Sequence, residues 1–237
     1  MKHEKTALFV VLFALVGMVF SGCAPSLQAR KVDKPDLVKS VLVDPSILEK
    51  GTEGEALYRY KNPKADWKKY TGVIIDPVII YQEAALDAET RENYQTLANN
   101  AYVFFTKELQ KEFKVVTAPG PGTMRIQFAI VSAEKSGSVS NVLTTVVPVG
   151  MVLSAGKYAA TGKPMGVGEI TGEARITDAS TGELLAAALD KRVGGKQLRG
   201  VFTAWQDADS GLQYWAELTR YRLCQLSGGA DCEKMKP

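Results

Sequence analysis

The first 22 residues most constrain what this 237-residue chain can fold into, because they have the layout of a secretory signal. Lys2 and Lys5 precede an uncharged apolar run from Ala7 to Phe20, and small residues then lead into Cys23. The run is too short to cross a bilayer as a helix, which needs about 20 residues. We therefore expect residues 1–22 to be a signal peptide, and the rest of the chain to fold in an oxidising compartment.

The sequence Phe20-Ser21-Gly22-Cys23 resembles the lipobox of bacterial lipoproteins, although Phe20 stands where that pattern usually has Leu. The resemblance implies that Cys23 becomes the first residue of a lipoprotein, carrying a diacylglyceryl group and a fatty acyl chain such as palmitate. The alternative is an ordinary cleavage site beside an incidental thiol. No Asp follows Cys23, and the sorting rules of such lipoproteins then imply a lipid anchor in the outer membrane, with the domain facing the periplasm.

Charge and residue content exclude several classes of function. Without residues 1–22 the chain has no histidine, and its 29 basic and 26 acidic residues fall to 27 and 25. This balance does not favour nucleic acid as a partner, and triads that use histidine are excluded. We expect no enzyme, no cofactor and no metal site. Asp76 is the one carboxylate that we consider as an acid or base, but an Asp-Pro pair more often makes a local turn or bulge.

Two further cysteines, Cys224 and Cys232, enclose the seven residues Gln-Leu-Ser-Gly-Gly-Ala-Asp. On a helix, the apolar face of this region leaves Cys224 on the opposite, solvated side, so burial does not explain it. Gly228 and Gly229 allow the chain to reverse after the helix, which favours a disulfide between the two cysteines. Two free thiols are the alternative, and a metal site is disfavoured because no histidine is left to complete it.

The sequence predicts three regions: a signal peptide (1–22), a lipidated N-terminus and extended tether (23–50), and a single periplasmic domain (51–237). Residues 23–50 are mostly polar without a sustained period, which is typical of a spacer. The length and apolar content of the remainder suffice for one core.

Within the domain the hydrophobic patterns predict an α+β fold, with two main helices packed on a mixed, largely antiparallel sheet of about five strands. An apolar strand is expected at 73–81, interrupted by Pro77, and a helix from an Asp87 N-cap to about Phe113. Short or alternating strands are expected at 114–117, 124–130, 169–177 and 184–193, the last two forming a hairpin, before a final helix near 210–226.

Several motifs resemble a bacterial lipoprotein family known as domain of unknown function 3313. They are D-P-S-I-L from Asp44, Y-K-N-P-K-A-D-W from Tyr60, Y-T-G-V-I-I-D-P-V from Tyr70, P-G-P-G-T-M-R from Pro119 and D-A-S-T-G-E from Asp178. At the level of fold the arrangement is weakly similar to the curli secretion channel lipoproteins and to the amino-terminal domain of the Tol propeller protein. The family has no established biochemistry, and a fold does not by itself imply a function.

Two surfaces are candidates for interaction. Tyr58, Tyr60, Trp67 and Tyr70 could stack on a glycan or peptide, although covering the sheet edge is favoured. The uncharged stretch 138–156 is the second, because a long apolar connection is usually functional or covered. Its candidate contact residues are Val139, Val142, Leu143, Val146, Val147, Val149, Met151, Val152 and Leu153. It packs on the chain's own core, forms a partner or self-association surface, or enters the membrane, and the sequence leaves these three open.

Together these features predict a non-enzymatic outer-membrane lipoprotein that binds a protein partner in envelope assembly, export or maintenance. A self-assembling, channel-like secretion lipoprotein is the alternative, with residues 138–156 meeting the membrane. An envelope enzyme that depends on a carboxylate is a distant third.

Overall fold

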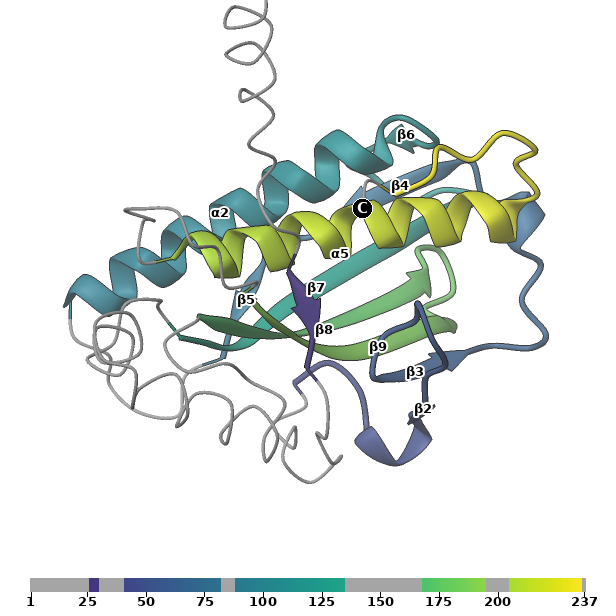
Figure 1. The fold of residues 1–237 in the computed structure, drawn as a ribbon. Helices are drawn as coiled ribbons and strands as arrows, with labels where there is room; N and C mark the ends of the chain where they lie inside the picture. Colours follow the sequence, from purple (N-terminus) through teal and green to yellow (C-terminus); the bar gives the residue numbers. More distant parts are fainter. Residues whose placement is uncertain (1–25, 30–40, 82–87, 135–167, 195–204, 236–237) are drawn as a thin grey trace, which may run out of the picture.

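The computed structural model describes residues 26–29, 41–81, 88–134, 168–194 and 205–235, and in these two long helices lie on one face of a single sheet (Figure 1). The α+β fold is therefore confirmed. In chain order the elements are β1 (Leu27–Gln28), η2 (Pro45–Ile47), β2 (Glu49–Lys50), β3 (Tyr58–Lys61), η3 (Trp67–Lys69), β4 (Gly72–Ile75), β5 (Ile79–Ile80), α2 (Ala88–Leu109), β6 (Lys114–Val115), β7 (Thr123–Glu134), β8 (Glu169–Asp178), β9 (Leu184–Val193) and α5 (Gln206–Ser227).

The sheet is mixed and largely antiparallel, as predicted. Its strand order is β2-β3-β9-β8-β7-β4-β6, with β1 beside β9 and β5 beside β7. Strands β4 and β5 run parallel to β7, and β6 runs parallel to β4, while the other pairs are antiparallel. The described residues form nine strands rather than about five. Four of them have only two residues, which is too short to produce an alternating pattern in the sequence.

The three longest strands form the centre of the sheet, and two of them make the predicted hairpin. β8 and β9 pair from Glu169↔Val193 to Thr177↔Leu184. Gly182, with a φ of 75°, adopts the left-handed conformation that the tight connection requires. On β7 the apolar side chains of the predicted alternation are buried under the helices; they are Met124, Ile126, Phe128 and Ile130.

Both helices bury the predicted apolar faces. In α2 the buried set includes Tyr94, Leu97, Ala101, Phe105 and Leu109. The helix ends at Leu109, four residues before the expected end. Phe113 is still buried, in the turn that follows.

Helix α5 lies close to the sheet because two glycines leave room for it. A Cβ atom on Gly172 of β8 would lie 2.6 Å from the Trp215 ring, and one on Gly211 of α5 would lie 2.7 Å from Ile170. These contacts fix α5 over β8, and Phe128 packs against Trp215 with ring centroids 5.6 Å apart.

The apolar run at 73–81 is divided into two strands, as Pro77 predicts. β4 is an inner strand with Val73 and Ile74 buried, whereas β5 contains Ile79, which is 37% exposed. The break at Asp76 to Val78 follows from the missing N–H of proline.

Parts of the range predicted to be a tether are paired with the sheet. Leu27 and Gln28 pair with Val193 and Arg192 of β9, and β2 pairs with β3. The described residues 26–29 and 41–50 are therefore part of the packed domain rather than a free spacer. Strands β1 and β2 have only two residues each, which is too short to give an alternating pattern, and the partner of β1 lies far along the chain.

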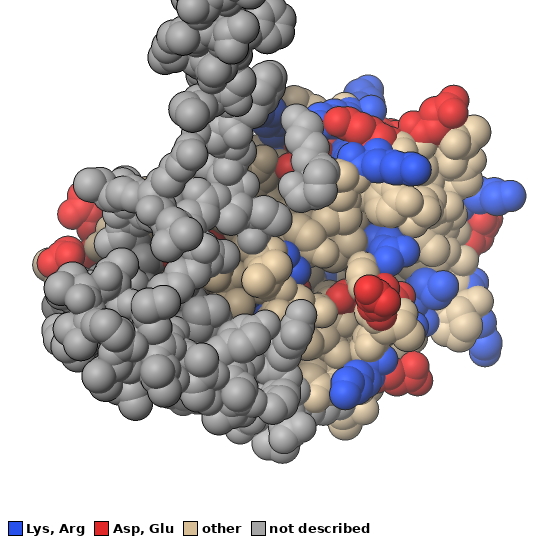
Figure 2. Space-filling model, viewed as in Figure 1, with Lys and Arg blue, Asp and Glu red and all other residues tan. Residues whose placement is uncertain are grey.

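On the face that Figure 2 shows, basic and acidic side chains are interspersed over the described residues, consistent with the near-balanced charge. Neither described helix is long and apolar enough to cross a membrane.

Candidate functional site

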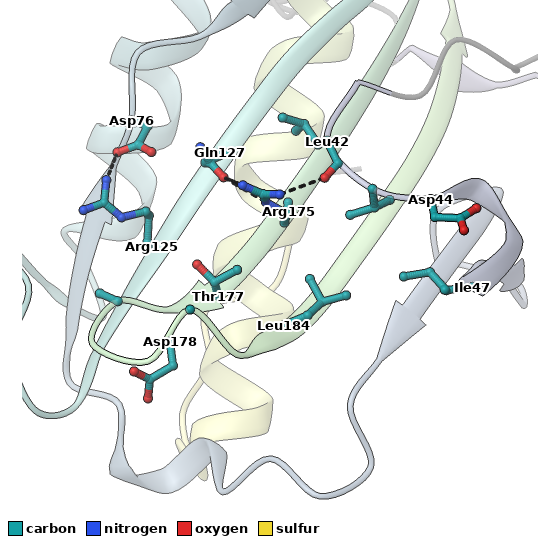
Figure 3. Close-up of a pocket in the computed structure, with 13 residues that line it drawn as sticks. Leu42, Asp44, Ile47, Asp76, Arg125, Gln127, Arg175, Thr177, Asp178 and Leu184 are labelled. Atoms are coloured by element: carbon teal, nitrogen blue, oxygen red, sulfur yellow. Dashed lines mark hydrogen bonds and ion pairs between the residues drawn. The ribbon is translucent and has the colours of Figure 1, made fainter.

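A polar groove lies on the face of the sheet that the helices leave uncovered (Figure 3). Its volume is about 470 Å³. We define the groove by its lining residues, which are Leu42, Val43, Asp44, Ile47, Asp76, Arg125, Gln127, Arg175, Thr177, Asp178, Ala179, Gly182 and Leu184. They come from β7, from the β8–β9 hairpin, from the start of the β4–β5 break and from the segment that contains η2.

The floor of the groove is set by the register of β7 and β8. Gln127 lies opposite Arg175, and Arg125 lies opposite Thr177, so these four side chains share one face. Arg175 Nε donates to Gln127 Oε1 at 2.8 Å, and Arg175 Nη1 donates to the carbonyl of Leu42 at 2.9 Å. The guanidinium is therefore fixed across two strands and against the segment that crosses them.

That crossing segment is held by a buried carboxylate. The Glu173 side chain is fully buried and accepts hydrogen bonds from three consecutive backbone N–H groups, those of Val41, Leu42 and Val43, at 2.7–3.1 Å. Successive N–H groups that converge on one anion form a stable nest. Asp44 then caps η2 by accepting from the Ser46 N–H at 2.8 Å. We call residues 41–47 the strap.

Arg125 and Asp76 form an ion pair at the opposite side of the groove. Arg125 Nη1 lies 2.6 Å from Asp76 Oδ1, with 34% of the arginine side chain and 19% of the aspartate side chain exposed. Asp76 is thus a partner of Arg125 directly after β4, as the view in Figure 3 shows. Because Nη1 makes this contact, the other N–H groups of the half-buried guanidinium remain available to a ligand.

The end of the hairpin closes the groove through Asp178. Its carboxylate accepts from the Tyr70 hydroxyl at 2.8 Å and from the backbone N–H groups of Ser180 and Thr181, and Lys69 Nζ lies 3.3 Å away. Burial raises the pKa of Asp178, but these hydrogen bonds outweigh burial and lower it to about 2. Burial, followed by the hydrogen bond to Asp178, raises the pKa of Tyr70 to about 12.

The groove presents hydrogen-bonding and charged groups on its surface. Its guanidinium and carboxylate groups are held at fixed positions, mostly on strands, so their order is set before any ligand arrives. Thr177 is the one hydroxyl among the lining residues. Within the described part of the chain no group of three His, Cys, Asp or Glu side chains could hold a metal ion.

Of the site residues predicted from sequence, the structure describes the cysteine pair. Cys224 and Cys232 form a disulfide with a Cα–Cα distance of 5.8 Å, which confirms the predicted bond. Cys23 and the candidate interaction segment from Val139 to Leu153 lie outside the described residues.

The predicted exposure of Cys224 is wrong. Cys224 is 3% exposed, because the chain reverses at Gly228, which is in the left-handed conformation, and the tail then packs over the helix end. The Gly229 N–H donates to the Cys224 carbonyl at 3.0 Å. The prediction from helical periodicity was wrong here because it takes no account of the chain that follows the helix and covers Cys224.

The four aromatic side chains are mainly structural. Trp67 and Tyr70 are buried in the main core, while Tyr58 and Tyr60 pack in a second cluster near the β3 edge with Leu48 and Leu189. The rings of Tyr58, Trp67 and Tyr70 are buried and therefore cannot stack on a glycan or peptide. These side chains cover the sheet instead.

Sequence reasoning identified Asp76 but missed Arg125, Gln127 and Arg175 as members of a site. The alternation on β7 and β8 did place them on the face opposite the apolar side chains. The missing information was the strap, whose contact with β8 joins residues about 130 positions apart.

Three comparisons bear on the chain as a whole. None of the curated proteins compared with this chain matches it. Among solved structures, it is similar to the PelC dodecamer from Paraburkholderia phytofirmans (9% identity, 73% of this chain and 96% of the other, TM-score 0.38). It is also similar to protein XCC0632 from Xanthomonas campestris, a DUF330 protein (11%, 71% and 91%, TM-score 0.38), and to the hypothetical protein CT253 from Chlamydia trachomatis (10%, 67% and 96%, TM-score 0.36).

At these TM-scores the structural likeness is weak and says nothing of function. The likeness to the curli channel and Tol proteins stays a prediction. A family match is stronger evidence, because the pattern of the family described as "Protein of unknown function (DUF3313)" covers residues 39–219, which is most of the chain. The chain therefore belongs to the DUF3313 family.

Proposed function

We propose that this chain is a non-enzymatic lipoprotein, anchored through Cys23 in the outer membrane, whose periplasmic domain binds a protein partner in envelope assembly, export or maintenance. The leader and the lipobox support the anchor. The disulfide between Cys224 and Cys232 supports an oxidising compartment.

The polar groove is the observation that supports partner binding. Its volume of about 470 Å³ falls in the range of about 300–1,000 Å³ that is typical of ligand sites. Arg175 is oriented by Gln127 and the strap, whereas Arg125 is half-buried with donors to spare. A guanidinium in this state suits a carboxylate or backbone carbonyl of a polypeptide.

Short peptide segments are a better match than small metabolites. The groove offers both positive and negative groups, Arg125 beside Asp76 and Asp44 at the strap. A polypeptide presents donors and acceptors along its length, so it can satisfy such a mixed surface at several points.

Photocrosslinking in cells tests this function. A photoreactive residue in place of Thr177 lies in the groove, whereas the same residue in place of Tyr102, which is 42% exposed on α2, is the matched control. We expect one discrete adduct from position 177 and not from 102. Arg125→Gln should reduce its yield about tenfold, because it removes a charged hydrogen-bond donor.

Each outcome has a defined meaning. The same adducts from positions 177 and 102, or no adduct at 177, would contradict a binding site in the groove. An adduct of twice the chain mass would identify the partner as a second copy and favour the self-assembling lipoprotein.

A further inference from the structure

A second hollow lies on the other face of the sheet, beside helix α5, and differs from the polar groove in its chemistry. Its volume is about 280 Å³, and it is lined by residues of α5, β3, β8 and β9. The strand register explains why it exists. One row across the sheet reads Phe128, Ala174, Ala188 and Arg59, and the next reads Ile126, Ile176, Ala186 and Lys61.

Side chains thus become smaller from the centre of the sheet toward β9. The helices cover the large side chains on β7, but beside α5 the floor consists of three half-buried alanines and Ile176. We call this floor, Ala174, Ile176, Ala186 and Ala188, the alanine trough. Leu218, Leu223 and Leu226 of α5 form its wall, so an apolar channel remains beside the helix.

The outer lip of the trough is positive. Arg59 and Lys61 of β3 stand on one side and Arg222 of α5 on the other, and Glu55 is the one carboxylate among the lining residues. Arg59 Nε lies 2.6 Å from Glu55 Oε2, and Arg222 Nη2 donates to the Gly54 carbonyl at 2.9 Å.

We propose that the alanine trough binds the alkyl chain of a single-chain anionic amphiphile, with its headgroup at the lip of Arg59, Lys61 and Arg222. The apolar channel and the positive lip match the two parts of such a molecule. This site is separate from the polar groove and does not depend on the function proposed for it.

An alkyl chain fits the trough better than a peptide does. The floor has only Ala and Ile side chains, so it offers no partner for the N–H and C=O groups of a peptide backbone, and leaving such groups unpaired on burial is costly. An alkyl chain needs no partner. Each methylene that is removed from water should raise the affinity about fourfold.

Titration calorimetry with decanoate tests the proposal, with decyl phosphate to distinguish a carboxylate from a phosphate headgroup. The protein is the full chain with Cys23→Ser, kept free of detergent. We expect one site for decanoate, a binding constant about sixteenfold lower for octanoate, which is shorter by two methylenes, and no binding of decyltrimethylammonium, whose headgroup is positive. Tighter binding of decyl phosphate would assign the lip to phosphate headgroups.

Variants locate the site. Ala188→Phe should abolish decanoate binding by filling the trough, and Ala186→Leu serves the same purpose if the larger side chain prevents folding. Lys61→Glu should weaken binding about fivefold, whereas Lys114→Glu, on β6 at the opposite end of the sheet, should not.

Equal binding of the cationic amphiphile, or binding that survives trough filling in a folded variant, would overturn the proposal. Binding of an acidic, apolar peptide in place of decanoate would overturn it in favour of a peptide site.

Discussion

At the scale of single residues, Asp178 joins the β8–β9 hairpin to the η3 region. Its carboxylate accepts from Tyr70 and from two backbone N–H groups of the turn, and it is 6% exposed. Its folded-state pKa of about 2 lies below the ordinary 3.8. Protonation of Asp178 therefore favours the unfolded chain. Its contribution to stability is complete above about pH 4 and is lost as the pH falls toward 2.

Asp178→Ala should accordingly lower the free energy of unfolding at pH 7 by about 1–3 kcal/mol, because it leaves the Tyr70 hydroxyl and two N–H groups without their acceptor. Between pH 4 and pH 2 the variant should lose less stability than the wild type. Urea denaturation followed by circular dichroism at a series of pH values measures both effects. Asp231→Ala, an exposed carboxylate near the C-terminus, is the control. Identical pH profiles for Asp178→Ala and wild type would contradict the assignment.

Buried charges are the part of this structure that the sequence could not predict at the residue scale. Alternation assigns Glu173 and Arg175 to the polar face of β8, but it does not reveal that Glu173 is fully buried. The donors that make its burial tolerable come from the strap, about 130 positions earlier. Cys224 is a similar case, since its cover is the tail beyond the helix.

At the scale of elements, strand β1 is held on β9 by two buried charges. Gln28 Nε2 donates to Asp190 Oδ1 at 2.9 Å, and Trp215 Nε1 donates to Asp190 Oδ2 at 2.7 Å. Arg192 Nε donates to the Ser26 hydroxyl at 3.3 Å, while its Nη2 donates to the Ser26 carbonyl. Burial raises the pKa of Asp190 and lowers the pKa of Arg192. Residues 26–29 therefore provide partners for groups that would otherwise be buried at a cost.

Neighbouring residues of β1 offer a matched test. Gln28→Ala removes one donor from Asp190 and a bond to the Glu55 carbonyl, and should lower the free energy of unfolding by about 1–2 kcal/mol. Leu27→Ala truncates a side chain that is 48% exposed. It should change the free energy of unfolding by less than about 0.5 kcal/mol. Chemical denaturation of the two variants compares them directly. Equal effects would show that β1 contributes through general packing and not through Asp190.

The elements that could be predicted are those whose pattern is local. Helices α2 and α5 and the β8–β9 hairpin repeat their periods over ten or more residues, so their apolar faces were predicted correctly, whereas the burial of Cys224 and Glu173 was not. Strands β1, β2, β5 and β6 have two residues each. They exist because a neighbouring strand offers hydrogen bonds, which is a tertiary property. The same holds for the polar groove. The alternating pattern predicted its floor on β7 and β8, whereas the position of the strap depends on a tertiary contact and could not be predicted.

At the scale of the whole molecule, β1 determines how a lipid on Cys23 would sit. Ser26 is buried and lies three residues after Cys23. Three extended residues span at most about 11 Å. On the proposed lipidation, the anchor would therefore hold the domain close to the membrane surface, and not at the end of a long tether.

The two hollows lie on opposite faces of the sheet. The polar groove lies on the sheet face away from the helices, and the alanine trough lies on the helix face. A partner in the groove and an amphiphile in the trough would thus approach from opposite sides of the sheet, and loss of one should leave the other intact.

Binding of a protein partner in the polar groove underlies the proposed function. Its most direct test is the light-scattering molar mass of the acylated protein, crosslinked in cells and extracted from membranes in mild detergent. We predict a discrete mass above that of one acylated chain for the wild type and for Lys114→Gln, and the mass of one chain for folded Arg125→Gln. A wild-type protein with the mass of a single chain, or an Arg125→Gln variant with unchanged mass, would contradict the claim.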